Sequence, residues 1–534
     1  MNFKDVDVSK LSPMMKQYFE TKTKYKNHIL FYRLGDFYEM FFDDAVTASR
    51  ELELTLTGRD CGLDERAPMC GVPHHACDLY IKKLIEKGYM VAICEQTADP
   101  AECKGIVPRE VIRVVTPGTL IESSMLDETT NNYIASFFVQ AKESALCLAD
   151  ISTGEVHLFE FNGKDMSTSA INELSRFSPV EILINDAFLS KKDISTFIRE
   201  KLKASVQLLE ESDFSPLIHT DEVLKQFSVN SLKSLKIDEN SVSAFAVCGL
   251  FAYIHETQKA LVGRFSTITK HDSDPIMTIG FTARRNLEIT ETLRNKEKKG
   301  SLLWVLDHTK TSMGKRMLKS YLEQPLTNPA KIIDRLNAVE QLVKSPVNLS
   351  ELSEILSGVY DLERLMTRVM YKTASPRDLK SLSITALKLP ELKKILNNFD
   401  SKLLVSLNNK ISTLEAISNL IENALVDEPP ITIKEGGLIK GIKVDNSADK
   451  FSRKDLDKLT EFIKIYKAKA LSYLKYNNGE LTGSIAKVLS DVEKQNLISE
   501  LSLNENDILM VVADKKKVVE QALGALRTKL ARDL

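Results

Sequence analysis

Several features are missing from this 534-residue sequence, and each absence excludes a class of protein. No run of about 18 apolar residues and no signal-peptide pattern occurs, which predicts no membrane span and favours a cytoplasmic location. The seven cysteines form no CxxC pair, so reduced thiols are expected rather than a disulfide framework. The 72 basic and 74 acidic residues nearly cancel, so any affinity for nucleic acid must come from local patches.

Familiar catalytic and nucleotide-binding patterns are also missing. The stretch closest to a GxxxxGK[ST] phosphate loop is TKTSMGKRM, but Thr309 stands at the first glycine position and Arg316 at the final hydroxyl position. No Ser/His/Asp or Cys/His arrangement has a recognisable spacing. The sequence therefore predicts no cofactor for these residues and no enzyme activity of their own.

What is present is the length and composition of a multidomain globular protein, with 43% hydrophobic and 27% charged residues. Short strands and helices alternate over 1–121, and a strand meander begins a second α/β region over 128–258. Apolar residues at three- and four-residue steps predict a helical domain over 262–437. Residues 438–534 form an α+β unit with a hairpin near 477–479. The expected fold class is thus α/β and all-α multidomain.

The stretch FYRLGDFYEMFFDD, residues 31–44, has two interpretations. In the structural one, Gly35 ends a strand, Asp36 caps a helix and Glu39 completes a D-x-x-E capping box behind Phe37. Spacing alone favours this interpretation. In the functional one, an exposed Phe37 ring wedges into a base step, and the Glu39 carboxylate accepts a hydrogen bond from the edge of an unstacked base.

The segment CGLDERAPMCGVPHHAC is the best metal candidate because it holds three cysteines and two histidines. Its spacing, C-x8-C-x3-HH-x-C, fits no common zinc pattern. A predicted turn at Gly71 and Pro73 would also separate the side chains. We therefore expect no zinc at these positions: Cys61, Cys70, His74, His75 and Cys77.

Two runs rich in basic residues, 284–299 and 364–380, lie within the helical part. Such runs are usually solvated helix faces, and contact with a DNA backbone is the less favoured alternative.

Long motifs in the first four fifths of the chain carry a family resemblance. PMMKQYFETKTKYKNHILFYRLGDFYEMFFDDAVTASRELELTLTGRD, PMCGVPHHA, VAICEQTADP and REVIRVVTPGT closely resemble the mismatch-recognition domain of the MutS family of DNA mismatch repair proteins. LADISTGE resembles its connector domain, which has an RNase H-like fold. TARRNLEITETLRNKEKKGSLLWVLDHTKTSMGKRMLKSYLEQPL, DLERLMTRVMYKTASPRDL and EPPITIKEGGLIK resemble its helical core or lever domain. The resemblance covers about residues 9–440, in family order.

The resemblance implies a role for the aromatic–acid pair. The Phe-x-Glu motif that reads mismatches in this family falls on Phe37 and Glu39. The ring would stack on the mispaired base while the carboxylate hydrogen-bonds to it in a kinked duplex. Mismatched double-stranded DNA and a MutL-type repair protein are the implied partners. The family uses ATP and Mg²⁺ through a domain whose motifs this sequence does not contain.

The last stretch resembles a different family. GIKVDNSADKFSRKDLDKLTEFIKIYKAKALSYLKYNNGELTGSIAKVLS and VVADKKKVVEQALGALRTKLARDL resemble the inserted GAD domain of bacterial aspartate–tRNA ligase, with Ser484 in place of a proline. The ligase's catalytic motifs are absent, so tRNA is not an expected partner. The resemblance implies two sequences joined near residues 438–443, and an incomplete helical domain with apolar faces uncovered on 302–322 and 331–343.

Three hypotheses therefore stand. The first is a module that binds mismatched duplex DNA. The second is an ATP-driven repair enzyme or an aspartate–tRNA-ligase-related fragment, disfavoured because neither nucleotide site is encoded. The third is an inert chimeric product.

Overall fold

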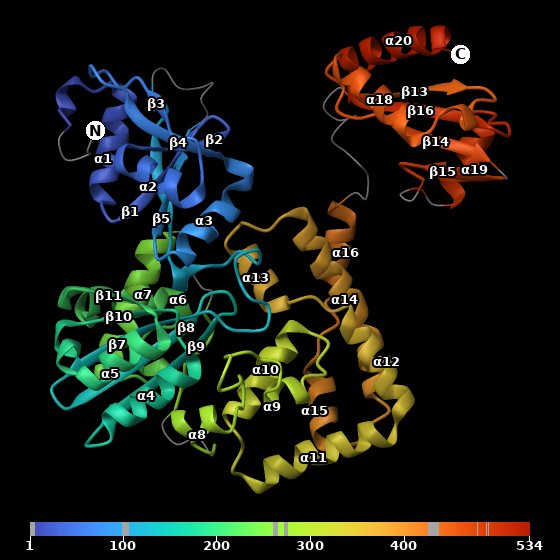
Figure 1. Cartoon of the computed structure of the whole chain (residues 1–534). Helices are drawn as coiled ribbons and strands as arrows, with labels where there is room; N and C mark the ends of the chain where they lie inside the picture. The colour runs from blue at the N-terminus through green and yellow to red at the C-terminus, as the bar shows by residue number, and fades with distance from the viewer. Residues whose placement is uncertain are drawn as a thin grey trace. The chain divides into compact units, whose positions relative to one another are not determined.

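The computed structural model describes residues 6–98, 106–259, 265–271, 276–425, 437–477, 479–486, 489 and 491–533. The chain divides into two compact units, Met1–Leu425 and Val426–Leu534 (Figure 1). The first unit contains two six-stranded sheets and a helical region, and the second contains a four-stranded sheet. No helix among the described residues is long and apolar enough to cross a membrane.

The first sheet has the strand order β3-β4-β2-β1-β5-β6. Its strands are β1 (His28–Leu34), β2 (Phe37–Phe41), β3 (Thr57–Arg59), β4 (Ala67–Pro73), β5 (Met90–Gln96) and β6 (Arg109–Val115). Only β1 and β5 pair in parallel; the other neighbours are antiparallel. Both faces are covered, because α2 (Phe42–Leu52) and α3 (Cys77–Glu86) pack on one face and α1 (Pro13–Lys24) packs on the other.

The prediction that a helix opens at Phe37 is wrong. Residues 37–41 are strand β2, which pairs with β1 on one side and β4 on the other, and α2 begins only at Phe42. Glu39 therefore completes no capping box with Asp36. The two ladders satisfy backbone groups on both edges of β2, and this outweighs the local D-x-x-E pattern.

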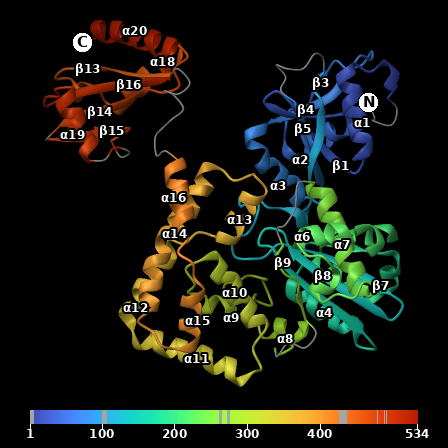
Figure 2. The same cartoon turned by 180° about the vertical axis from the view of Figure 1, so that it is seen from behind.

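The second sheet has the order β11-β10-β7-β8-β9-β12. The predicted meander is confirmed as β7 (Tyr133–Gln140), β8 (Glu143–Asp150) and β9 (Glu155–Asn162), and it is extended in parallel by β10 (Glu181–Ile184), β11 (Ser205–Leu208) and β12 (Thr269–Lys270). The apolar helix α7 (Val242–Gln258), together with α6 (Pro216–Phe227), covers one face (Figure 2). Helices α4 (Met166–Phe177) and α5 (Lys192–Phe197) cover the other.

A buried carboxylate fixes the segment between the two sheets. Glu181 on β10 accepts hydrogen bonds from Thr116 Oγ1 at 2.5 Å, the Gly118 N–H at 2.9 Å and the Tyr253 hydroxyl at 2.7 Å. Burial raises the pKa of Glu181. The chain leaving β6 is thereby held against β10 and α7, so the first sheet is attached to a rigid neighbour.

Helices form the rest of the first unit, as predicted. They are α8 (Phe281–Asn286), α9 (Leu302–Leu306), α10 (Ser312–Glu323), α11 (Pro329–Lys344), α12 (Pro346–Ser357), α13 (Leu362–Met370), α14 (Pro376–Leu396), α15 (Lys402–Lys410) and α16 (Glu415–Ala424). Prolines begin α11, α12 and α14, where no backbone donor is needed. The expected uncovered faces are confirmed, since α9, α10 and α11 expose large apolar side chains, among them Trp304, Met317 and Leu336.

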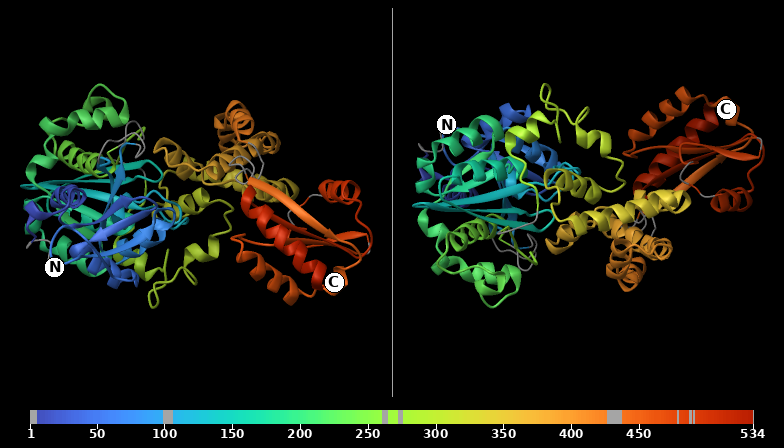
Figure 3. Two further views of the ribbon diagram at one scale, coloured as in Figure 1. Left: turned by 90° about the horizontal axis from the view of Figure 1, so that it is seen from above. Right: turned by 90° about the horizontal axis from the view of Figure 1, so that it is seen from below.

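The second unit is an α+β unit with the sheet order β13-β16-β14-β15. The predicted hairpin is β14 (Ser472–Asn477) with β15 (Glu480–Gly483), and β13 (Gly437–Val444) pairs with β16 (Asp507–Lys515). Helices α18 (Arg453–Lys464) and α20 (Lys516–Asp533) pack on one face of the sheet (Figure 3). Helix α19 (Asp491–Glu500), which the sequence pattern did not reveal, packs on the other.

Candidate nucleic-acid interface

Phe37 lies at the tip of the β1–β2 hairpin, directly after the turn at Gly35 and Asp36. Its ring is 46% exposed, whereas the following residues Tyr38, Met40 and Phe41 are buried. Gly35 has a φ of 59°, a conformation that glycine adopts without strain. The sequence prediction that Gly35 ends the strand and that Phe37 faces outward is consistent with this geometry.

The turn is fixed from two sides. The His74 N–H donates to the Asp36 carbonyl oxygen at 3.0 Å, so the residue after β4 holds the turn. Arg33 Nε donates to the Gly35 carbonyl oxygen at 2.5 Å. With both carbonyl groups bonded, the Phe37 backbone is held in place and only its ring can adjust to a ligand.

The inward face of the hairpin is tied to β5. The Tyr38 hydroxyl donates to Glu95, whose carboxylate also pairs with Arg33 Nη1 at 3.5 Å. Burial and the hydrogen bond to Glu95 raise the pKa of Tyr38. Tyr38 therefore stays neutral at physiological pH, and its hydroxyl keeps the hydrogen bond to the Glu95 carboxylate.

Glu39 lies on the same face of β2 as Phe37, because side chains alternate along a strand. Its Oε2 accepts a hydrogen bond from Arg59 Nη1 at 2.5 Å. Arg59 is on β3, which is separated from β2 by β4. The strand pairing places Gly71 directly opposite Glu39, whereas Arg59 pairs with Ala67 on β4, so the Arg59 side chain crosses β4 diagonally to reach Glu39.

A second guanidinium lies on the other side of Glu39. Tyr32 on β1 pairs with Glu39 across the strands. Arg109 lies 5.2 Å from the centre of the Tyr32 ring and donates to Gln17 Oε1 at 3.2 Å. The surface thus combines an exposed aromatic ring, a carboxylate and cations. These groups can stack on a base, accept a hydrogen bond from its edge and neutralise phosphate.

The five metal candidates do not converge. Cys61 lies in the core beneath α1, whereas Cys70 lies on the opposite side of the sheet and donates to the Ala45 carbonyl oxygen at 3.4 Å. Burial raises the pKa of the Cys70 and Cys77 thiols to about 12. Within the described ranges, no group of three or more His, Cys, Asp or Glu side chains could hold a metal ion. The predicted turn at Gly71 and Pro73 is wrong, since both residues belong to strand β4.

The basic runs also contain structural residues. Arg364 is buried and donates to the carbonyl oxygens of Asp127 at 2.8 Å and Thr130 at 2.7 Å. Arg284 is buried and donates to the Asn172 carbonyl oxygen at 2.7 Å. These two arginines join the helical region to preceding segments, so they are unavailable to a DNA backbone.

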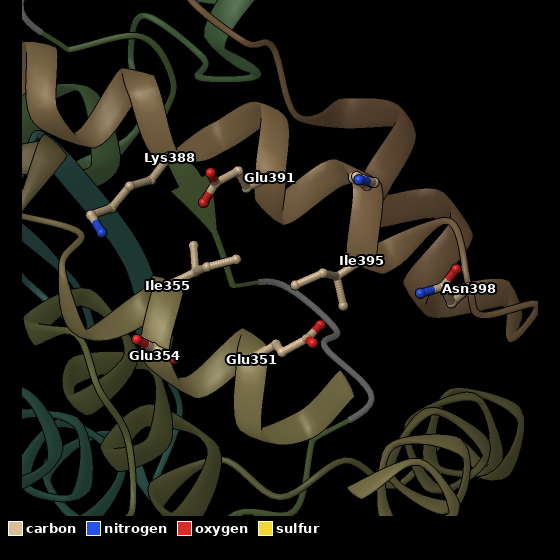
Figure 4. Close-up of a pocket in the computed structure, with 8 residues that line it drawn as sticks. Glu351, Glu354, Ile355, Lys388, Glu391, Ile395 and Asn398 are labelled. Atoms are coloured by element: carbon tan, nitrogen blue, oxygen red, sulfur yellow. The ribbon is translucent and has the colours of Figure 1, made fainter. Parts of the chain in front are cut away.

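An open groove of about 510 Å³ lies between α12 and α14. Figure 4 shows Ile355 and Ile395 pointing toward one another in it. The charged residues that line it are three glutamates and two lysines: Glu351, Glu354, Glu391, Lys388 and Lys394. The acidic excess repels phosphate, so this groove is no part of the candidate interface.

Two residues that shape the site had no signal in the sequence. Arg59 is 20 positions from Glu39, and only the register of β3 on β4 brings them together. Gly71 was expected in a turn, but it lies opposite Glu39 on strand β4 and leaves space beside it.

Comparison with known proteins gives the family. Three domain models match in succession: MutS domain I over residues 12–124, MutS domain II over 132–268 and MutS domain III over 282–531. The third match includes most of the second unit.

Curated proteins named DNA mismatch repair protein MutS are similar to most of the chain. The protein of Alkaliphilus oremlandii is 45% identical over 436 residues, 81% of this chain and 49% of the relative. That of Lachnoclostridium phytofermentans is 44% identical over 433 residues, 81% of this chain and 46% of the relative. The chain thus spans about half the length of these relatives. Three successive MutS domain matches, with this identity across four fifths of the sequence, show that the chain belongs to the MutS family of DNA mismatch repair proteins.

Proposed function

We propose that this chain binds mismatched double-stranded DNA through Phe37 and Glu39. The observation that carries the proposal is the position of Phe37, an exposed ring on a strand whose other apolar residues are buried, with a carboxylate on the same face. Family membership and the Phe-x-Glu spacing support the same function.

The physical argument rests on the cost of unstacking a base. A phenyl ring can enter a base step only if that step opens, and a mispaired base opens at lower cost than a paired one. Because the Phe37 backbone is held by the bonded turn, the ring needs little ordering when it stacks. The Glu39 carboxylate then accepts a hydrogen bond from the exposed base edge. Matched duplex gains neither contact.

Replacement of Phe37 by alanine tests this function. Stacking of a base on an aromatic ring contributes roughly 1–3 kcal/mol, so Phe37→Ala should remove most of the preference for mismatched over matched duplex. Gel shifts with the two duplexes measure the preference, and circular dichroism checks the fold. Leu79→Ala, which removes an exposed apolar side chain on α3, is the matched control and should keep the preference.

Two results would contradict the proposal. A Phe37→Ala variant with full discrimination would show that another residue reads the mismatch. A wild-type chain that binds both duplexes equally, or neither, would favour the third hypothesis, an inert chimeric product.

We also propose that a MutL-type repair protein is a partner and that these 534 residues bind no ATP. The second statement follows from the missing phosphate loop, since Thr309 and Arg316 stand at two of its required positions. Thr309 instead donates its hydroxyl hydrogen to Asp307 Oδ1 at 2.6 Å. Calorimetric titration with ATP and Mg²⁺ should give no saturable heat, and micromolar binding would overturn this.

For residues 438–534 we propose a GAD-like domain joined to the MutS-like part. Its support is the resemblance of its sequence to the aspartate–tRNA ligase insert and its separation as a compact unit. The curated relatives match 81% of this chain, and the MutS domain III match extends to residue 531. Long-read sequencing across the codons for 438–443 tests the fusion, and an uninterrupted reading frame in native DNA is expected.

A further inference from the structure

Arg59 reaches Glu39 across an entire strand. The order of the sheet is β3-β4-β2, so the guanidinium of Arg59 must pass over β4 before it can donate to the Glu39 carboxylate at 2.5 Å. The side chain of Arg59 is 37% exposed and that of Glu39 is 17% exposed. The pair therefore lies on the outer surface of the sheet, on the face that also presents Phe37.

Gly71 leaves space beside Glu39. It stands opposite Glu39 on β4, and a Cβ atom added there would lie 3.3 Å from the Tyr38 carbonyl oxygen and 3.4 Å from Glu39 Cγ. Any larger side chain would therefore press on Glu39 and displace the carboxylate that Arg59 holds. Since Gly71 has an ordinary backbone conformation, no turn requires glycine there.

The ion pair between Arg59 and Glu39 also reduces the negative charge that an approaching duplex meets at this surface. An isolated carboxylate beside Phe37 would repel the phosphates of any approaching duplex. Paired with Arg59, the carboxylate is neutralised and held in one position. A base edge can become its partner only if the base leaves its stack, because a stacked base cannot reach the sheet surface.

We propose that Arg59 is a positioning residue that holds the Glu39 carboxylate beside Phe37 and so sets the preference for mismatched duplex. The inference rests on the proposed function and deepens it. Arg59 acts through Glu39, whereas Gly71 acts by leaving room for the Glu39 side chain.

A double-mutant design tests this proposal. Arg59→Met removes the donor and keeps an apolar stem, and it is made both in the wild-type chain and in Glu39→Ala. Arg66→Met is the matched control, because Arg66 directly precedes β4, is exposed, and forms no ion pair within the described part of the chain. Affinities for mismatched and matched duplex are measured for every variant at several salt concentrations.

The expected result is a loss of discrimination that depends on Glu39. Arg59→Met should lower the ratio of mismatched to matched affinity roughly tenfold, the size expected for loss of a charge-assisted hydrogen bond. In the Glu39→Ala background, Arg59→Met should lower the ratio of mismatched to matched affinity no more than Arg66→Met does. Arg66→Met should weaken both duplexes alike and leave the ratio unchanged, because it removes only phosphate attraction.

Two further variants separate positioning from folding. Gly71→Ala keeps Arg59 but places a methyl group beside Glu39, so it should lower the ratio in the same direction. Arg59→Lys keeps a cation and a donor and should retain most of the ratio. Thermal unfolding of each variant identifies any that fail to fold. If Arg59→Met is one of these, Gly71→Ala becomes the decisive variant.

Specific outcomes would overturn the inference. If Arg59→Met weakens both duplexes equally, or lowers the ratio equally with and without Glu39, Arg59 is a simple phosphate contact. If the wild-type chain discriminates and Phe37→Ala does not, while Arg59→Met discriminates fully, only this inference fails. If the wild-type chain itself shows no preference, the proposed function fails with it.

Discussion

Strand β2 and helix α11 place their apolar side chains in opposite ways. On β2, Tyr38, Met40 and Phe41 are buried beneath α1, α2 and α3, and Phe37 alone is exposed. On α11, five apolar residues are between 37% and 66% exposed: Ile332, Ile333, Leu336, Val339 and Val343. One exposed ring on a covered framework is suited to a specific contact, whereas a whole exposed face is a surface that tends to associate.

The helical region has a buried charge cluster in addition to its own apolar core. Arg316 on α10 is 6% exposed and donates to Asp361 Oδ2 at 2.7 Å, Glu363 Oε2 at 2.6 Å and the Glu128 carbonyl oxygen at 3.2 Å. Arg316→Met would remove the buried guanidinium that Asp361 and Glu363 share. We expect it to lower the free energy of unfolding by about 3 kcal/mol, the largest effect among these predictions.

The single tryptophan, Trp304 on α9, allows a local measurement of this change. Its fluorescence during urea titration follows the helical region near Arg316. Lys344→Met is the control, because Lys344 pairs with Glu340 on an exposed face of α11 and should have no measurable effect. Equal urea midpoints of unfolding for Arg316→Met and Lys344→Met would mean that the Arg316 cluster contributes little to the free energy of unfolding.

In the α/β part, by contrast, one buried glycine has no room for an added methyl group. Gly249 lies in the buried helix α7, and a Cβ atom there would lie 2.3 Å from Phe214 Cδ1. Phe214 is fully buried and cannot move aside. Gly249→Ala should therefore lower the free energy of unfolding by about 1–3 kcal/mol, although alanine is the better helix former. Thermal unfolding followed by circular dichroism measures the change.

A second helical glycine provides the matched comparison. At Gly524 on α20, an added Cβ atom would have nothing within 4 Å. Gly524→Ala should stabilise its unit by up to about 1 kcal/mol through helix propensity alone. If Gly249→Ala and Gly524→Ala changed the free energy of unfolding in the same direction, packing against Phe214 would not be the cause of the Gly249→Ala effect.

The same contrast explains which features the sequence could predict. The meander of β7, β8 and β9, the hairpin of β14 and β15, and the helices around Met317 and Leu336 follow from local periodicity. Strand β2 was assigned to a helix because Asp36 and Glu39 have capping spacing. Its strand conformation also depends on pairing with β4, whose partner residues lie 28 to 36 positions away, and no local pattern encodes this pairing.

The residues of the candidate site also fall into two groups, those that the sequence predicts and those that only the tertiary structure brings together. Phe37 and Glu39 are two positions apart and stand in a family motif, so they could be named in advance. Arg59 and Gly71 belong to the site only because β3, β4 and β2 pair in one register. A contact that depends on three strands is set by tertiary structure, and a single sequence does not show it.

The exposed face of α11 should control self-association. Leu336→Lys with Val343→Lys would place two charges on this face, and light scattering at high protein concentration should then show less association than the wild type. Because both positions are exposed, the free energy of unfolding should change by no more than about 0.5 kcal/mol per site. Leu79→Lys, at an isolated exposed leucine on α3, is the control and should leave scattering unchanged. A wild-type chain that is monomeric at high concentration would contradict the prediction.

The smallest expected effect concerns the charge beside Phe37. Glu39→Ala removes a negative charge from the DNA-facing surface and at the same time releases the Arg59 guanidinium that it holds at 2.5 Å. Both changes favour phosphate, so matched duplex should bind a few-fold more tightly at low salt, while the preference for mismatched duplex narrows. One extra phosphate contact steepens the slope of log affinity against log salt by about 0.9. Matched-duplex affinity measured from low to moderate salt, for Glu39→Ala and for Glu39→Ala with Arg59→Met, separates the two contributions. The steeper slope should appear only in the variant that keeps Arg59, and a slope equal to that of the wild type would show that the released guanidinium does not reach the DNA.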